Sequence, residues 1–148
     1  MYYIAIVLQW IHVGLGIAWF GTVLYQDFML FPVLARLEVG TRAQFMAAFW
    51  PRFRRSIAAL AGLTILSGIV RGLVLGLQVP STYFFTYAAA IVVGIFLAGF
   101  GARVLTPATE PALDGNLEAL ERLRRLLVIE LSAFLVIFTL MIAMRFGY

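Results

Sequence analysis

The chain has 148 residues, of which 64% are hydrophobic and 12% are charged, and this balance excludes a water-soluble domain because such domains carry about twice as much charge. The formal net charge of +4 comes entirely from arginine, which in so apolar a chain bears on membrane orientation and argues against a nucleic-acid partner. The absence of cysteine excludes disulfides, thiolate metal sites and a cysteine nucleophile.

Four apolar stretches are long enough to cross a lipid bilayer, since one helical span needs about 20 apolar residues. They cover about residues 3–24, 56–77, 82–105 and 126–146. The spans leave room only for short connections, so residues 1–148 are predicted to form a single transmembrane domain, an all-α bundle of four helices. The first span lacks the basic start and small-residue cleavage site of a signal peptide.

The connections carry their own signals. Pro32 is expected to disturb the helix that continues from the first span, because proline lacks the backbone N–H. Residues 39–55 have a capping-box pattern and an apolar face, which predict a short helix in the interface plane between the first two spans. The segment PATEPALDGN is predicted to be a loop, and Asn116 at its end is predicted to cap the helix that becomes the fourth span.

Arginines are distributed unequally between the two sides of this predicted bundle. One side takes only Arg71 and Arg145, and the other takes the remaining nine. These are Arg36, Arg42, Arg52, Arg54, Arg55, Arg103, Arg122, Arg124 and Arg125. Because cytoplasmic loops hold the excess of positive charge, both termini and the GLQVPST turn are predicted on the non-cytoplasmic side of the cell's inner membrane.

Three ionisable residues lie inside the spans, where each needs a partner or a purpose. They are His12, Arg71 and Glu130. At a helical rise of 1.5 Å per residue, His12 and Arg71 lie at similar depths, roughly 13 Å and 9 Å from the outer ends of their spans. Helical spacing places Gln9, His12, Gly16 and Trp19 on one face of the first span, and Thr64, Ser67, Gly68 and Arg71 on one face of the second. The two polar stripes are expected to face each other.

This pattern suits a b-type haem. Neutral imidazole can ligate iron or copper, Gly16 would let a flat macrocycle approach, and Arg71 could pair with its propionates. The second axial ligand would be Met141, Met144 or the His12 of another subunit. Alternatively, His12 bonds Gln9, Ser67 or a carbonyl and joins two helices, while Arg71 extends to the outer surface.

Glu130 lies near the inner end of the fourth span. One interpretation is an ion pair with an arginine at a neighbouring helix end, such as Arg55 or Arg103, because a charge at that depth costs least when it is paired. The other is a catalytic, proton-handling role, which an oxidase or a carrier would need.

Three segments resemble the copper-resistance D (CopD) and HemJ-type superfamily of membrane proteins. They are LQWIHVGLGIAWFGTVLYQDFMLFPVL, PRFRRSIAALAGLTILSGIVRGL and LRRLLVIELSAFL. The matching residues are His12, Trp19, Gly21 and Pro32 in the first, Ser67 and Gly68 in the second, and Arg124 or Arg125 with Glu130 in the third.

HemJ-type proteins are four-helix membrane proteins that bind haem b and are implicated in oxidising protoporphyrinogen. The resemblance therefore implies His12 as a haem ligand and Glu130 as a functional carboxylate. The sequence departs from that family in its third helix, where TYFFTYAAAIVVG lacks the family's histidine and lysine, and this departure concerns the oxidase activity more than the fold. The copper-resistance relatives imply metal movement, although the outer loop here lacks histidine and methionine clusters.

From these observations we expect a haem-b-binding membrane protein of the b-type cytochrome kind, active in electron transfer or oxidoreduction with an electron donor or acceptor. We expect a homodimer or a larger homo-oligomer. Two other functions remain open at this point. One is transport of copper or a small solute through the groove between the polar stripes, and the other is a structural role in a larger membrane complex.

Overall fold

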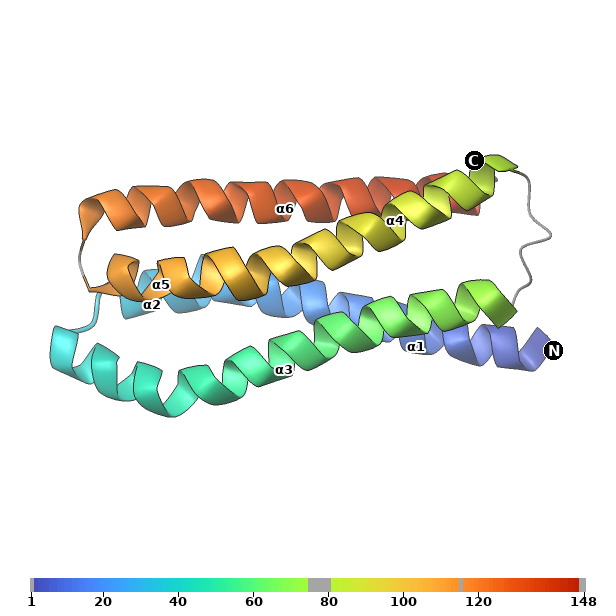
Figure 1. Cartoon of the computed structure of the whole chain (residues 1–148). Coiled ribbons are helices and arrows are strands. Elements are labelled where there is room, and N and C mark those ends of the chain that lie inside the picture. The colour runs from blue at the N-terminus through green and yellow to red at the C-terminus, as the bar shows by residue number, and fades with distance from the viewer. Residues whose placement is uncertain (1, 75–80, 115, 147–148) are drawn as a thin grey trace.

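In a computed structural model, which describes residues 2–74, 81–114 and 116–146, the chain is helical and these residues contain no strand (Figure 1). The elements are α1 (Tyr2–Tyr25), η1 (Gln26–Leu30), α2 (Phe31–Leu34), α3 (Val39–Val74), α4 (Ser81–Phe100), η2 (Gly101–Leu105), α5 (Thr106–Leu113) and α6 (Leu117–Arg145). The two η elements are π-helical turns, which are wider than α-helical turns because each hydrogen bond spans five residues.

Four continuous helical segments are long and apolar enough to cross a membrane. They are Tyr3–Leu34, Val39–Val74, Tyr83–Leu113 and Leu117–Arg145. Their outward faces carry large apolar side chains such as Trp10, Ile17, Phe85 and Leu135, each more than 65% exposed. Lipid is the environment that such faces require. The prediction of an all-helical fold with four helices long and apolar enough to span a membrane is therefore confirmed.

The two halves of the chain repeat one order of elements. In each half a long helix is followed by a π turn, a short α-helix and a second long helix. Pro32 and Pro107 occupy equivalent places, in the first turn of α2 and of α5, directly after η1 and η2. Proline lacks the backbone N–H, and in each half the hydrogen-bond pattern changes from α to π directly before it. Pro32 therefore lies at a disturbance of the helix, as expected, although the helix continues to Leu34.

Two connections differ from expectation. The segment 39–55 is helical as predicted, but it is continuous with the second span, and α3 has 36 residues with Pro51 inside it. Figure 1 shows α3 bending in its first half, as an internal proline causes. The loop predicted for PATEPALDGN is wrong, because most of it forms α5. Asn116 caps α6 as predicted, accepting a hydrogen bond from the Ala119 N–H at 3.1 Å. Most of the GLQVPST turn lies outside the described residues.

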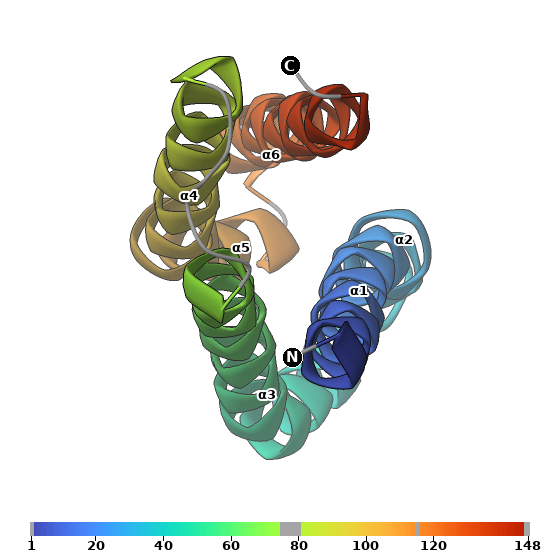
Figure 2. The ribbon, with the colours of Figure 1, turned by 90° about the vertical axis from the view of Figure 1, so that its right-hand side faces the viewer.

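The long helices pack as two pairs, α1 with α3 and α4 with α6, which meet along α3 and α4. Viewed end-on in Figure 2, α1 and α6 stand apart on the remaining side. Both α1 and α6 have their chain-terminal ends at one end of the bundle, here called the terminal end (Figure 1). The opposite end, here called the arginine-rich end, holds α2, α5 and the starts of α3 and α6.

Candidate cofactor pocket

Hydrogen bonds to the neighbouring helix α3 hold the His12 side chain in place. Its Nδ1 lies 3.0 Å from the Thr64 carbonyl oxygen and 3.2 Å from Ser67 Oγ. A carbonyl oxygen can only accept, so Nδ1 carries the hydrogen and Nε2 keeps its lone pair. Ser67 Oγ also donates to the Thr64 carbonyl at 2.9 Å. The two polar stripes therefore meet as predicted, and the histidine is left with one nitrogen free to ligate.

Gly68 permits this approach of α1 to α3. A Cβ placed at Gly68 would lie 2.9 Å from His12 Cε1, closer than side chains tolerate. Gly16 is less constrained, since a Cβ there would be 3.9 Å from Thr64 Cγ2. Any side chain at position 68 would therefore displace the imidazole, whereas position 16 has room.

A cavity of about 440 Å³ opens beside His12 between the four long helices. We call it the histidine cavity. It is within the size range of small-molecule and cofactor sites. Seven of the residues predicted to bind the cofactor or its metal line it, namely His12, Gly16, Trp19, Gly68, Arg71, Met141 and Met144. The other two of that set, Ser67 and Gln9, do not line it. Ser67 is hydrogen-bonded to His12 Nδ1. Gln9 has a buried side-chain oxygen without a hydrogen-bond partner among the described residues.

Arg71 is the charged group of this cavity. It is half-buried, and its Nε is buried without a hydrogen-bond partner among the described residues. Among the residues that the structure describes, no acidic side chain lines the cavity. A guanidinium in an apolar wall is stabilised by an anion that it can bond through two nitrogens. The cavity is therefore suited to a largely apolar ligand with an acidic group.

Four aromatic rings line the histidine cavity on the side nearer the arginine-rich end, and we call them the aromatic layer: Trp19, Phe20, Phe134 and Phe138. The centroids of Trp19 and Phe134 are 5.1 Å apart, and those of Phe20 and Phe138 are 4.8 Å apart. These pairs join α1 to α6, whose backbones are otherwise separated. On the side of this layer nearer the terminal end, Met141 and Met144 line the cavity from α6, and His12 lines it from α1.

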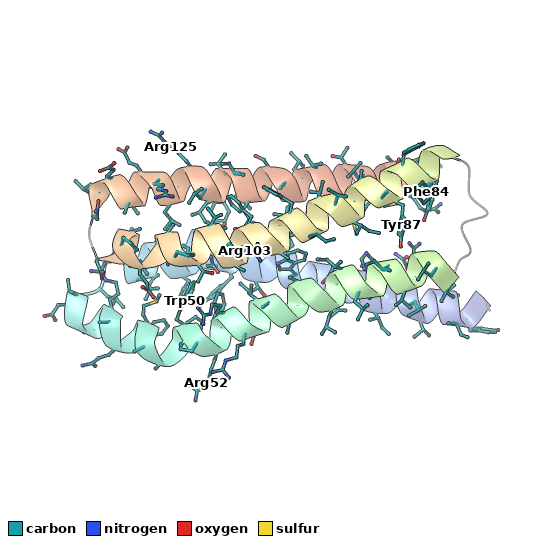
Figure 3. The ribbon with its side chains drawn as sticks, in the orientation of Figure 1. Trp50, Arg52, Phe84, Tyr87, Arg103 and Arg125 are labelled. Carbon is teal, nitrogen blue, oxygen red and sulfur yellow. The ribbon has the colours of Figure 1, made fainter. Side chains whose placement is uncertain are left out.

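Tyr87 is a site residue that the sequence analysis missed. Its hydroxyl donates to the Ile69 carbonyl at 3.1 Å, with the Gly68 carbonyl at 3.4 Å, and it lines the histidine cavity. Figure 3 shows it pointing from α4 towards α3. A Cβ at Gly72 would overlap its ring. The spacing of Gly68 and Gly72 was the available signal, because paired small residues indicate close helix contact.

Glu130 does not belong to the histidine cavity. It is buried on the other side of the aromatic layer, and its Oε2 has no hydrogen-bond partner among the described residues. The expected ion pair with Arg55 or Arg103 does not form, and both arginines are exposed. Instead, the buried polar residues near it are Gln26 and Asp27, which the predicted end of the first span had left outside the membrane interior.

Comparisons with protein-family models, with curated proteins and with solved structures find no match. The resemblance to CopD and HemJ-type proteins therefore stays a prediction from the sequence. Within the described residues there is also no group of three or more histidine, cysteine, aspartate or glutamate side chains that could hold a metal ion.

Proposed function

We propose that this protein binds haem b in the histidine cavity, with His12 Nε2 as an axial ligand, and serves electron transfer or a related oxidoreduction. The observation that carries the proposal is the histidine whose Nδ1 is engaged by Thr64 while Nε2 is free at the wall of an apolar cavity. Haem ligands commonly have their second nitrogen fixed in this way, which sets the tautomer and strengthens the ligand.

The other walls fit the same group. Arg71 offers a propionate a cation whose buried Nε has no hydrogen-bond partner among the described residues, and Gly16 leaves space next to the imidazole. Met141 or Met144 would supply the second axial ligand from α6 unless a second subunit does so. When bound, haem would supply the one-electron chemistry. The chain's own residues would hold and orient it, and the apolar walls would exclude water and so help to set its potential.

The distribution of arginines indicates how the protein is oriented in the membrane. We infer that the arginine-rich end faces the cytoplasm and that both termini lie on the non-cytoplasmic side of the inner membrane. We also infer that the first part of α3 follows the membrane interface, that the chain works as a homodimer or larger assembly, and that it exchanges electrons with a separate donor or acceptor. Membership of the CopD and HemJ-type superfamily is part of this proposal.

One observation favours a second candidate, a copper site. His12, Met141 and Met144 line one cavity, and thioether and imidazole ligands suit Cu(I). A CopD-like role in copper movement would follow. Arg71 argues against it, because an unpaired guanidinium in the same cavity repels a metal cation and attracts an anionic ligand.

The test is to purify the protein after haem-supplemented expression and to record its absorption spectrum and metal content. We expect a Soret band that is lost in His12→Ala and kept in Ile11→Ala, the matched control on the lipid-facing side of the same helix. A wild-type protein without a Soret band, or a band that survives His12→Ala, would overturn the haem assignment. Stoichiometric copper without a Soret band would establish the second candidate instead.

A further inference from the structure

A second cavity, of about 190 Å³, lies on the arginine-rich side of the aromatic layer. We call it the glutamate cavity. Its polar lining residues are Gln26, Arg54, Thr106, Thr109, Glu130 and the indole of Trp50. Trp19 lines both cavities and is only 5% exposed, so its side chain is part of the wall between them. The proposed haem site uses none of the polar groups on this side.

Two polar atoms at this cavity are buried without a partner. Glu130 is 5% exposed and its Oε2 accepts no hydrogen bond, while Trp50 is 9% exposed and its Nε1–H donates none to the described residues. Figure 3 shows Trp50 projecting from α3 into the bundle. Inside a bilayer such groups must find partners within the protein or in enclosed water. Water can accept from the indole and donate to the carboxylate, and the cavity has room for about six molecules at roughly 30 Å³ each.

A second carboxylate lies close by. Asp27 in η1 is near enough to Glu130 to act on it electrostatically, and neither of its carboxylate oxygens has a hydrogen-bond partner among the described residues. Both acids lie against π turns. Asp27 belongs to η1, and Glu130 Oε1 lies 3.7 Å from the position of a Cβ on Gly101 in η2. Wide turns of this kind occur frequently at functional sites.

Two neighbouring carboxylates in the membrane interior repel each other, and the pair is stabilised when it holds a positive charge or a proton. Asp27 from η1 acts on Glu130 electrostatically. Arg54 from α3 lines the glutamate cavity, whereas α5 contributes Thr109 and η2 contributes no charged lining residue. Arg54 repels a metal cation. The described residues also offer no third acidic, histidine or cysteine ligand.

We propose that the glutamate cavity is a hydrated proton-binding site, in which one proton, brought by water from the arginine-rich end, is held by Glu130 or by the nearby Asp27. Arg54 is exposed and lines the same cavity, so it marks the path from the membrane surface. In the transfer step, the water bonded to Glu130 gives its proton to the carboxylate and takes one from the next water. The net result is a neutral carboxylic acid and one proton fewer in the aqueous phase.

The experiment uses the full haem-free chain in lipid nanodiscs near neutral pH and treats it with dicyclohexylcarbodiimide. The O–H of a protonated carboxylic acid adds across a C=N bond of this apolar reagent, and the O-acylisourea that forms rearranges to a stable N-acylurea, which is a covalent mass tag. We expect one tag per chain, found by peptide mass spectrometry on Glu130 or Asp27, and a loss of tagging as the pH is raised. Glu130→Gln should abolish the tag on that residue. Glu121→Gln, an exposed acid on the same helix, should not change tagging of the cavity.

Several results would contradict the proposed proton site. An untagged wild type, or tagging confined to exposed acids such as Glu118 and Glu121, would overturn the proposal. Protection of the carboxyls by sodium at fixed pH and ionic strength would assign the site to a metal cation instead. Because Glu130→Gln could also unfold the chain, infrared spectra of the wild type provide an independent test. We expect a protonated-carboxyl band that shifts in D2O, and its absence would count equally against a proton site. No step of this experiment requires haem, so its result does not depend on whether the haem proposal is correct.

Discussion

At the arginine-rich end, the short helices α2 and α5 fill the space between the long helices, whereas none of the described elements does so at the terminal end. The filled end contains an apolar cluster built from Leu30, Phe31, Leu34, Trp50, Leu105, Ala112, Leu113 and Leu123. The open end contains the histidine cavity, lined by His12 and Arg71. The interior of both ends is lined mainly by apolar side chains, so the difference lies in the filling elements. A bundle whose long helices are packed through short helices at one end can hold them apart at the other and keep a pocket between them.

The largest expected effect concerns the filled end. Leu34→Ala should lower the free energy of unfolding by about 3 kcal/mol, because it leaves a void in a tightly packed cluster. Leu34 is 1% exposed. The control is Leu73→Ala at the open end, where Leu73 is 63% exposed and a loss below about 0.5 kcal/mol is expected. Denaturation in detergent measures both, and equal losses would remove the distinction between the two ends.

The next effect concerns the fit between α1 and α3. Gly68→Ala should weaken haem binding by roughly 10- to 100-fold, because the new Cβ displaces the imidazole. Losses of this size are typical when residues that orient a metal-ligating histidine are changed. Haem titration followed by absorption measures this change. Gly62→Ala on the same helix is the matched control, since an added Cβ there meets nothing within 4 Å. Similar affinities for the two variants would show that the position of His12 does not matter.

Arg71→Gln should lower haem affinity by about tenfold, the loss expected for one charge-assisted hydrogen bond. The same titration applies. Arg145→Gln removes an exposed charge at the same end of the bundle and should leave the affinity unchanged. If both variants lose affinity alike, the effect of Arg71 is one of net charge and not of pairing within the cavity.

The smallest effect concerns Tyr87. Tyr87→Phe removes the hydroxyl that donates to the Ile69 carbonyl and should lower stability by about 1 kcal/mol. Tyr83→Phe, on the same helix and stacked on Tyr87, tests whether a lost hydroxyl there matters by itself. Denaturation in detergent again provides the measurement. A stable Tyr87→Phe variant would mean that packing alone holds α3 to α4.

Much of the fold could be predicted, because runs of about 20 apolar residues have few stable alternatives to a spanning helix. The meeting of His12 with the polar stripe of α3 followed from helical spacing in the same way. The helix α5 could not be predicted, because its prolines and small residues are typical of loops. It is stabilised by burying Ala112 and Leu113 in the apolar cluster, which is a tertiary effect.

The glutamate cavity was equally hidden in the sequence. Gln26 and Asp27 follow the apolar part of the first span, where a polar pair usually marks the end of a membrane helix. In the structure the helix continues through η1 and turns both side chains into the interior. A π turn has no sequence signature comparable to a capping residue. The partner of Glu130 was therefore sought among arginines and not among acids.

We propose that His12 Nε2 binds the haem iron in the histidine cavity, and this bond can be tested directly. The chain contains one histidine, so tag-free protein grown with histidine labelled with ¹⁵N at Nε2 alone carries a single labelled position. Pulsed electron paramagnetic resonance of the oxidised, haem-loaded protein should then detect a hyperfine coupling between the iron and that ¹⁵N. Haem-loaded protein without this coupling would contradict the account.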